Sequence, residues 1–302
     1  MNVTFRQLRL FLALADSGSV SAAAKAMHVT QPTASMQLKE VTRSVGAPLF
    51  EFVGKKFYLT DLGRELAATA RAVAQSWDAF EQSVDAVKGL SRGKLKVAVV
   101  STAKYFMPRL IGSFCKQHPA IDISLEILNR DGVVQRLREN LDDLYIMSMP
   151  PAGMDLNDAV FMANPIVVIA ATSDALTKSK SKSVSLNALA QRRFIFREKG
   201  SGTRMAVDQY FRKMRLKPDI RLELGSNEAV KESVAGGLGI GVVSRHALHG
   251  LKKEHGVSVI ELEGFPLPSA WHIVHPASKK LSPLAVAFKQ HLLRQAPHYE
   301  LR

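Results

Sequence analysis

Residues 19–39, SVSAAAKAMHVTQPTASMQLK, limit the fold more than any other part of the chain. The alanines let a second helix approach closely, and His28-Val29 makes a tight turn between the two helices. Thr30 is a good N-cap, and Pro32 is tolerated in the first turn because its missing N–H would have had no partner there. We therefore expect a short helix, a turn and a second helix that runs to about Ser44.

The second predicted helix has an apolar and a polar face. Ala34, Leu38 and Val41 fall at i, i+4 and i+7 and form the inward face. The other side chains suit the major groove of DNA, because amide, hydroxyl and apolar groups contact base edges and cations contact phosphates. The candidate DNA-contacting residues here are Thr30, Gln31, Pro32, Thr33, Ser35, Met36 and Lys39. An ordinary helical pair with a polar outer face is the alternative.

The flanking segments favour a DNA-reading unit. Apolar residues repeat at helical spacing within residues 5–14 and predict a third helix that covers the pair. Residues 49–60, LFEFVGKKFYLT, predict a two-stranded hairpin with Lys55 and Lys56 at its tip, where a phosphate backbone would lie. Residues 1–60 contain seven basic and three acidic side chains, a net charge of +4. The excess is modest but locally placed.

A long amphipathic helix is predicted from Asp61 to about residue 90. Its apolar side chains are spaced by threes and fours as in a coiled coil, without a proline. Such a stripe needs a partner, and we expect a second copy of the chain; packing on its own domain is the alternative. The candidate dimerisation residues are Leu66, Val73, Trp77, Phe80 and Val84. Gly89 and residues 91–93 are expected to form a linker.

These motifs resemble those of LysR-type transcriptional regulators. The resemblance is carried by residues 19–35, by PLFE at 48–51 and by LTDLG at 59–63. It implies a winged helix-turn-helix, mostly α, followed by a linker helix, in a dimer or tetramer on a dyad operator in double-stranded DNA, with RNA polymerase as a further candidate partner. Met36 departs from the basic or polar residue frequent in relatives, so their base preference does not transfer.

Beyond residue 93 the pattern alternates between strands and helices, which predicts an α/β fold. Strands are expected at 94–102, 121–128, 142–149, 165–170, 193–196, 239–244 and 270–275, with early helices at 105–116 and 132–139. The segment resembles the two-subdomain effector module of the same family, which is similar to periplasmic binding proteins. A ligand would sit between the halves, at the carboxyl ends of strands.

The expected domains follow from these patterns and from the resemblance. They are a winged helix-turn-helix at 1–60, a linker and dimerisation helix at 61–90, and an effector-binding domain at 91–302. Within the last, the chain is expected to cross to a second subdomain near residues 163–165 and to return near 266–270. The first subdomain would comprise 91–163 and 268–302, and the second 164–267.

Polar and basic residues gather where four of these strands are expected to end. Hydroxyls, cations and helix N-termini together favour an anion. STAKYF, NRDG, REKGSGTR, GSNE and WHIVH also resemble the regulators of carbon-fixation operons, which implies a phosphorylated or carboxylated effector. The candidate effector-binding residues carried over are Ser101, Thr102, Lys104, Arg130, Arg197, Ser201, Gly202, Thr203, Arg204 and Asn227. Arg204 and Lys104 are expected to face each other and hold the anion. A sulfur or nitrogen metabolite is the alternative within the family.

Charge agrees only partly with a DNA-binding role. The formal net charge is +14, but residues 1–90 contribute +2 (ten basic, eight acidic) and residues 91–302 contribute +12 (thirty-one basic, nineteen acidic). Residues 178–221 alone contain thirteen basic and three acidic side chains. A solvated surface explains such an excess, and so does attraction of an anionic ligand.

Other classes of protein fit less well. The single cysteine, Cys115, excludes a disulfide within one chain. We expect a cytoplasmic protein, because the sequence contains neither a signal peptide nor an apolar run long enough to span a membrane. An enzyme or a solute-binding protein acting on a small anion is the alternative class. However, the nine histidines form no metal-binding spacing and no nucleophile lies in an elbow motif, so we expect no catalytic residue, metal or cofactor.

Overall fold

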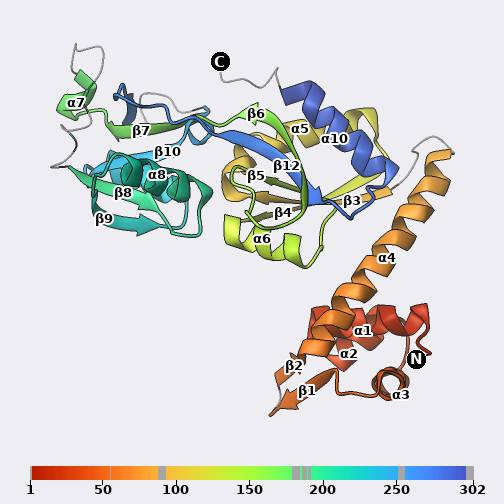
Figure 1. The fold of residues 1–302 in the computed structure, drawn as a ribbon. Helices are drawn as coiled ribbons and strands as arrows, with labels where there is room; N and C mark the ends of the chain where they lie inside the picture. Colours follow the sequence, from red (N-terminus) through yellow and green to blue (C-terminus); the bar gives the residue numbers. More distant parts are fainter. Residues whose placement is uncertain are drawn as a thin grey trace. The chain divides into compact units, whose positions relative to one another are not determined.

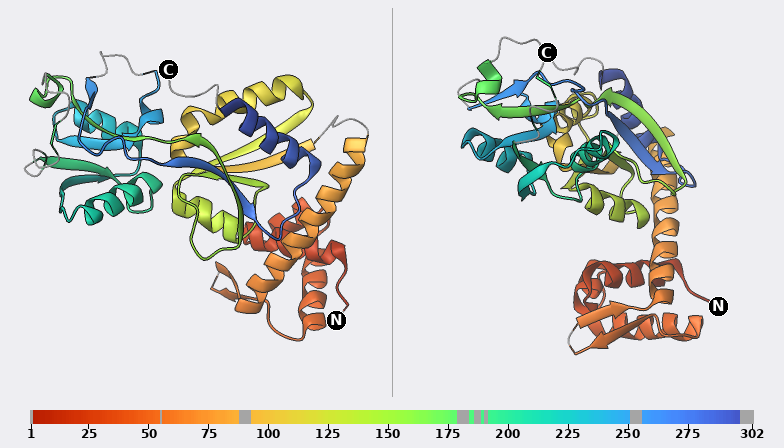
Figure 2. Two further views of the ribbon diagram at one scale, coloured as in Figure 1. Left: turned by 45° about the horizontal axis from the view of Figure 1, so that its top comes forward. Right: turned by 60° about the vertical axis from the view of Figure 1, so that its left-hand side comes forward.

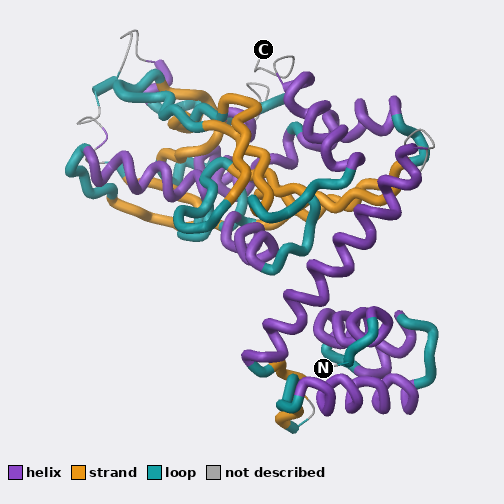
Figure 3. Tube along the Cα trace, turned by 45° about the vertical axis from the view of Figure 1, so that its right-hand side comes forward, coloured by secondary structure: helices purple, strands orange, loops and turns teal. Residues whose placement is uncertain are grey.

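The fold is described from a computed structural model that covers residues 2–54, 56–87, 93–178, 184–185, 189, 192–250 and 256–296. The chain forms two compact units, residues 1–87 and, apart from the short segment 139–141, residues 88–302. Figure 3 shows the helices and strands along the trace. Among the described helices, none is long and apolar enough to cross a membrane.

The first unit begins with three helices, as predicted (Figure 1). They are α1 (Phe5–Ser17), α2 (Val20–Ala26) and α3 (Gln31–Val45). Each helix is preceded by an N-cap residue, Thr4, Ser19 and Thr30 respectively. The hydroxyl oxygen of the N-cap accepts a hydrogen bond from a backbone N–H of the first turn, which has no partner within the helix. Their shared core consists mainly of Leu10, Phe11, Leu14, Ala23, Ala24, Ala34, Leu38 and Val41. The inward face predicted for α3 is therefore confirmed.

The wing hairpin and the long helix follow. Strands β1 (Phe50–Val53) and β2 (Lys56–Leu59) pair antiparallel, and α4 runs over Asp61–Val87. Thr60 joins them, since its hydroxyl donates to Pro48 O at 2.8 Å and accepts from Gly63 N at 3.0 Å. At Gly63 a Cβ would lie 1.8 Å from Leu49 O, so only glycine allows α4 to start this close to the hairpin.

The first sheet of the second unit has the strand order β4-β3-β5-β12-β6. Its strands are β3 (Gly93–Val100), β4 (Ile121–Leu128), β5 (Leu144–Met147), β6 (Leu156–Ala163) and β12 (Ala270–Pro276). Helices α5 (Met107–Gln117) and α10 (Pro283–Gln295) cover one face and α6 (Arg130–Arg138) the other, as Figures 1 and 2 show. Strands β3, β4 and β5 are parallel, whereas β12 is antiparallel to β5 and β6.

The second sheet has the order β11-β7-β10-β8-β9. Its strands are β7 (Ile166–Ala171), β8 (Arg193–Arg197), β9 (Asp219–Leu224), β10 (Ile240–Ser244) and β11 (Val257–Ile260). Alternate strand residues pack on opposite faces, against α8 (Gly202–Lys213) on one and α9 (Asn227–Ala235) on the other. The short helix α7 (Ala175–Lys178) follows β7.

The chain passes between the two sheets at β6–β7 and returns at β11–β12. Asn164 N donates to Ser269 O at 2.8 Å, and Ile166 pairs with Leu267, so the two crossing segments lie side by side. His246, in the short 3-10 helix Arg245–Leu248, is buried beside them with its Nε2 2.9 Å from Ala163 O.

Several element boundaries differ from the sequence-based expectation. The helix predicted at 105–116 is α5, which begins at Met107 with Pro108 in its first turn, and a 3-10 turn, Ser101–Tyr105, precedes it. Helix α6 begins at Arg130 rather than Gly132, since Asn129 Oδ1 accepts from Gly132 N at 2.9 Å and caps an earlier start. Strands β6, β9 and β11 were not predicted. Each lies at a sheet edge, where fewer apolar side chains are needed.

Candidate functional site

Helix α3 presents the predicted DNA-contacting residues unevenly. Gln31, Pro32 and Lys39 are exposed, and Met36 is 55% exposed although it is apolar. Thr33 and Ser35 are half-buried. The Thr33 hydroxyl lies 2.8 Å from that of the capping Thr30, and Gln31 Nε2 donates to Ser35 Oγ at 3.4 Å. The side chains most open to a partner are therefore Gln31, Met36 and Lys39.

At the wing, Lys56 is exposed and pairs in register with Val53. Lys55, the other predicted phosphate contact, lies outside the described residues. The wing also exposes apolar groups, since Phe52 and Val53 are more than half exposed. Phe52 extends an aromatic cluster with Phe50 and Phe57, at ring-centre distances of 6.0 and 5.7 Å. The tip thus combines an exposed cation with apolar surface.

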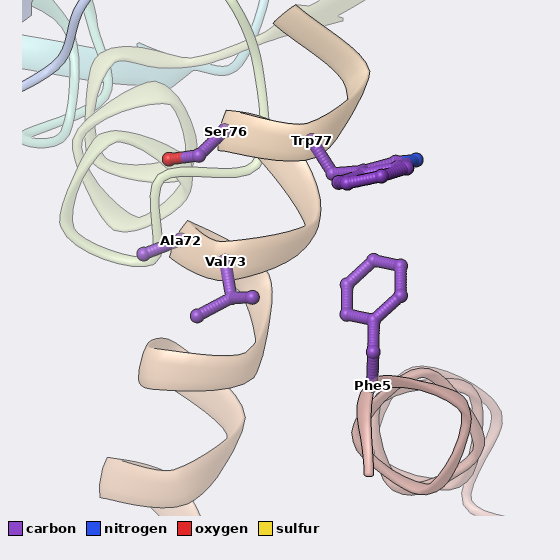
Figure 4. A pocket seen from close by; sticks show the side chains of 5 residues that line it. All are labelled: Phe5, Ala72, Val73, Ser76 and Trp77. Carbon is purple, nitrogen blue, oxygen red and sulfur yellow. The ribbon is translucent and has the colours of Figure 1, made fainter. Parts of the chain in front are cut away.

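The apolar stripe on α4 serves two regions. Its first half packs within its own unit, where Ala67 and Ala70 are buried and Leu66 is half-buried against the three-helix core. The second half is open: Val73, Trp77, Phe80 and Val84 are 42, 49, 57 and 43% exposed. The Trp77 ring faces Phe5 in a tilted arrangement, with ring centres 5.9 Å apart (Figure 4). Phe5, Ala72, Val73, Ser76 and Trp77 line an open, mainly apolar groove. Leu66 therefore supports its own domain, and the exposed stripe begins at Val73.

A small polar cavity lies in the second unit, with a volume of about 10 Å³, which is room for one water-sized sphere. Most of the predicted effector-binding residues line it, at the ends of β3 and β8 and at the starts of α6 and α8. The lining residues are Val100, Ser101, Thr102, Arg130, Ser148, Arg197, Ser201, Gly202 and Thr203. Ligand pockets commonly measure ~300–1,000 Å³. This cavity is much smaller than that, so a metabolite would enter it only if the lining residues move apart.

The start of α8 contributes free donors to this cavity. Ser201 stands at the N-cap, but its side chain does not cap the helix. The first N–H groups of a helix have no partner within it and carry the positive end of the helix dipole. The approach is close, since a Cβ at Gly202 would lie 2.8 Å from Ser148 Oγ. Backbone N–H groups, hydroxyls and cations thus converge in one small volume.

Arg130 is the cavity cation with the weakest internal pairing. Its Nε donates to Met149 O at 2.7 Å, and its Nη1 lies 3.6 Å from Asp131 Oδ1, which belongs to a largely exposed side chain. The Arg130 side chain itself is mostly buried. Burial lowers the pKa of Arg130, and Asp131 offsets only part of that shift. An anion in the cavity would compensate this charge.

Arg197 is more deeply buried and fully engaged. Its side chain is 2% exposed, and Nε and Nη2 donate to the two carboxylate oxygens of Glu198 at 2.8 and 3.0 Å. Its Nη1 donates to Asn227 Oδ1 at 3.0 Å, and Nη2 also reaches Ser101 Oγ at 3.2 Å. Arg197 thereby joins β8, α9 and the turn after β3 around the cavity.

Lys104 does not line the cavity. Its Nζ lies 3.0 Å from Glu228 Oε2, and Tyr105 Oη donates to the other oxygen of the same carboxylate. Burial alone would raise the pKa of Glu228, but the hydrogen bonds from Tyr105 and Lys104 outweigh it and lower that pKa to about 2. Lys104 therefore forms an ion pair that joins the turn after β3 to α9. This geometry does not favour the expected contact between Lys104 and an effector.

Arg204 does not line the cavity either. Its side chain is 5% exposed, with Nε donating to Asp208 at 2.8 Å and Nη1 donating to Arg197 O at 3.0 Å. Glu223 lies 3.2 Å from Nη1, and the guanidinium stands 5.2 Å from the Phe196 ring centre. Arg204 and Lys104 thus do not face each other across a cleft, because each forms an ion pair with a nearby carboxylate, Asp208 and Glu228 respectively.

Asn227 acts as a bridge outside the cavity lining. It is buried, accepts from Arg197 Nη1 and donates Nδ2 to Thr102 Oγ1 at 3.0 Å. Three relevant side chains were missed from sequence: Ser148, Glu198 and Glu228. Ser148 follows β5 and belongs to no recognised motif. Glu198 and Glu228 are adjacent in sequence to the predicted effector-binding residues Arg197 and Asn227, but they were not considered as counter-charges of the cations there. Within the described part of the chain, no group of three His, Cys, Asp or Glu residues could hold a metal.

Both units match models of one protein family. Residues 5–64 match the bacterial regulatory helix-turn-helix protein of the lysR family. Residues 88–297 match the LysR substrate binding domain. Together the matched segments cover the three-helix unit, the wing and nearly all of the second unit.

Related proteins share almost the whole chain. It is 42% identical over 292 residues to the HTH-type transcriptional activator CmpR of Synechocystis, covering 96% of this chain and 95% of that protein. It is 40% identical to a RuBisCO operon transcriptional regulator of Acidithiobacillus ferrooxidans, covering 96 and 94%. Among solved structures, the CcmR regulatory domain of Synechocystis in complex with 2-PG is 41% identical, with a TM-score of 0.66, covering 69% of this chain and 99% of that one.

Proposed function

This chain belongs to the LysR family of bacterial transcriptional regulators and is related to those of carbon-fixation operons; from that premise we propose that its polar cavity binds a small phosphorylated or carboxylated metabolite. The observation that carries the proposal is the meeting of Arg130 and Arg197 with an uncapped helix N-terminus and several hydroxyls in one small cavity. Cations and free N–H groups at a helix start favour oxyanions. The similarity to a domain bound to 2-PG supports the same ligand class.

The proposal assigns ligand contact to the residues that line the cavity. Arg130 supplies the main counter-charge, because its own carboxylate neighbour is distant and exposed. Ser101, Thr102, Ser148, Ser201 and Thr203 orient the anion through their hydroxyls. Arg204 and Asn227 support the site from outside, through contacts to Asp208 and Thr102, whereas Lys104 forms a partly exposed ion pair with Glu228 and has no role in binding.

Calorimetric titration of the full chain with 2-phosphoglycolate tests the effector proposal. Wild type should bind saturably. Arg130→Ala should weaken binding roughly ten- to a hundredfold, since a charge-assisted hydrogen bond contributes ~1.5–3 kcal/mol. Lys104→Ala is the control: its ion pair is partly exposed, and the affinity should change little. Equal binding by wild type and Arg130→Ala would place the anion elsewhere.

We further propose that α3 reads a dyad operator in double-stranded DNA as part of a homodimer joined along the exposed stripe of α4. The wing lysines and Lys39 would contact phosphates, and Gln31 and Met36 would contact bases. The proposal is supported by the helix-turn-helix family match and by large apolar side chains left exposed from Val73 to Val84. Within this proposal, assembly to a tetramer and contact with RNA polymerase are secondary expectations.

Phe80→Lys tests the dimer. Phe80 is 57% exposed in the single chain, so the substitution leaves the fold intact but places a charge where an apolar knob must pack. Sedimentation should show loss of the dimer, and a gel shift should show loss of binding to a two-half-site operator. Ala68→Lys puts the same charge on an exposed position away from the stripe and should leave both properties unchanged. A Phe80→Lys protein that still dimerises would locate the interface elsewhere.

A further inference from the structure

One of the two cations that line the cavity, Arg197, is paired with a carboxylate, that of Glu198. Glu198 places both carboxylate oxygens on the Nε–Nη2 edge of Arg197, at 2.8 and 3.0 Å, in the two-pronged arrangement that a carboxylate or phosphate ligand would use. The Arg197 side chain is 2% exposed and Glu198 is 25% exposed, so water screens the pair poorly. Glu198 therefore occupies the position on Arg197 that suits an anionic ligand best.

The charge balance around the cavity shows why the Arg197–Glu198 ion pair affects anion binding. The two cations that line it, Arg130 and Arg197, are matched by the neighbouring carboxylates Asp131 and Glu198, so the four side chains sum to zero. A bound anion gives the group a net negative charge. Asp131 lies 3.6 Å from Arg130, but 68% of its side chain is open to solvent against 25% for Glu198, so water screens the charge of Asp131 more than that of Glu198.

We propose that Glu198 is an internal counter-ion that competes with the effector for the charge of Arg197 and so sets the affinity of the cavity for anions. This inference rests on the proposed effector site and adds a specificity-determining residue to it. Without ligand, Glu198 supplies the counter-charge of a buried guanidinium whose other partners are neutral. With ligand, the same carboxylate repels the anion. Only anions that interact strongly with both arginines and the hydroxyls bind against this competition.

The proposal separates stability from binding. Glu198→Gln keeps the size of the side chain but removes its charge. The protein without effector should melt at a lower temperature, because Arg197 loses its counter-charge. The variant should nevertheless bind 2-phosphoglycolate more tightly, by roughly tenfold, which corresponds to the low end of a charge-assisted contact. A residue with a purely structural role would lower the melting temperature and would not raise the affinity.

Arg204 and Asp208 supply a matched control. Arg204 is also buried, and its Nε donates to both carboxylate oxygens of Asp208, at 2.8 and 3.0 Å, but Arg204, unlike Arg197, does not line the cavity. Asp208→Asn should therefore lower the melting temperature without increasing the affinity for the anion. If instead Asp208→Asn tightens binding and Glu198→Gln does not, the anion contacts Arg204 and the proposal is wrong.

The experiment is calorimetry of the full chain with 2-phosphoglycolate and with inorganic phosphate, together with thermal unfolding, on wild type and both variants. Unchanged or weaker binding by Glu198→Gln, with normal binding by wild type, overturns the role of Glu198 alone. Failure of wild type and Glu198→Gln to bind either anion overturns the effector site itself. If Glu198→Gln does not fold, Glu198→Asp serves instead: its shorter carboxylate does not span both Arg197 nitrogens, so tighter binding is again expected and unchanged or weaker binding rejects the proposal.

Discussion

The reading helix and the effector cavity place functional side chains in opposite surroundings. On α3, Gln31 and Lys39 are exposed, and their position follows from the helical repeat that buries Ala34 and Leu38. In the cavity, Arg197 is buried, and what it can bind depends on Glu198. What an exposed site can bind therefore depends on the direction of its side chains. What an enclosed site can bind depends on which of its charges are already paired with neighbouring side chains.

The largest expected effect concerns Gly63, at the buried junction between the wing hairpin and the start of α4. Gly63→Ala places a methyl group 1.8 Å from Leu49 O, a backbone atom that can move only with the hairpin. The first unit should lose about 3 kcal/mol or more of unfolding free energy, at or beyond the upper range for overpacking. DNA binding in a gel shift should fall sharply, while calorimetric binding of the effector should persist.

A glycine in the second unit is the control for that substitution. A Cβ at Gly112, on the exposed side of α5, would meet nothing within 4 Å, so Gly112→Ala should be neutral or stabilise by ~0.5–1 kcal/mol. If Gly63→Ala binds operator DNA as wild type does, the geometry of this junction does not govern DNA binding by α3. The contrast drawn between α3 and the effector cavity would then be smaller.

A smaller effect separates base reading from phosphate contact on α3. Gln31→Ala should cost ~1–3 kcal/mol at one base pair of the operator and relax specificity there. Lys39→Ala should weaken cognate and random DNA alike and reduce the slope of affinity against salt concentration. Fluorescence anisotropy at several salt concentrations distinguishes the two. Identical behaviour of both variants on cognate and random DNA would contradict the assignment.

The smallest effect is a pH dependence confined to the second unit. Burial lowers the pKa of His246, His275 and His291 below the usual 6.5, and their backbone hydrogen bonds or charged neighbours do not reverse the shift. The unfolded chain therefore takes up protons first, so the stabilisation is fully present above pH 6.5 and is lost as the pH falls from 6.5 towards the folded pKa values. The first unit has a single histidine, the exposed His28.

The two tryptophans allow this pH effect to be measured by unit. Trp271 is buried in the second unit and Trp77 lies on α4, so Trp77→Phe leaves Trp271 fluorescence as a reporter of the second unit alone. Its melting temperature should fall between pH 7 and 5. A melting temperature that stays constant over this range would mean that protonation of the three histidines does not oppose folding.

The sequence predicted the helices of the first unit well because each has a local signal. Ser19 and Thr30 are N-caps, and Ala34, Leu38 and Val41 repeat at helical spacing, so no distant contact is needed to place them. The central strands of the second unit were equally clear, since a strand buried on both faces is a continuous apolar run. The edge strands β6, β9 and β11 mix charged and apolar residues and gave no such signal.

The cavity was predicted in place but not in detail. Ser101, Arg130, Arg197 and Ser201 follow strand ends, and topology brings strand ends together. Which cation stays available is decided by tertiary contacts: Lys104 pairs with a residue 124 positions away, and Arg204 with one 19 positions away. No spacing rule in a single sequence reports these two long-range pairings, although the contact of Arg204 with Asp208, four residues further along α8, follows a helical spacing. The expected clamp of Arg204 and Lys104 was not found.

The order of strands in the first sheet has a consequence for synthesis of the chain. Strand β12 lies between β5 and β6 although it is made after the whole second sheet. Residues 164–269 separate β6 from β12, so a ribosome working at about 5–20 residues per second needs roughly 5–20 s to deliver the missing strand. During that interval the nascent chain has a three-helix unit made of local contacts but an unfilled gap beside β5. Trp271, at the centre of the first sheet's core, is therefore among the last apolar groups to be buried.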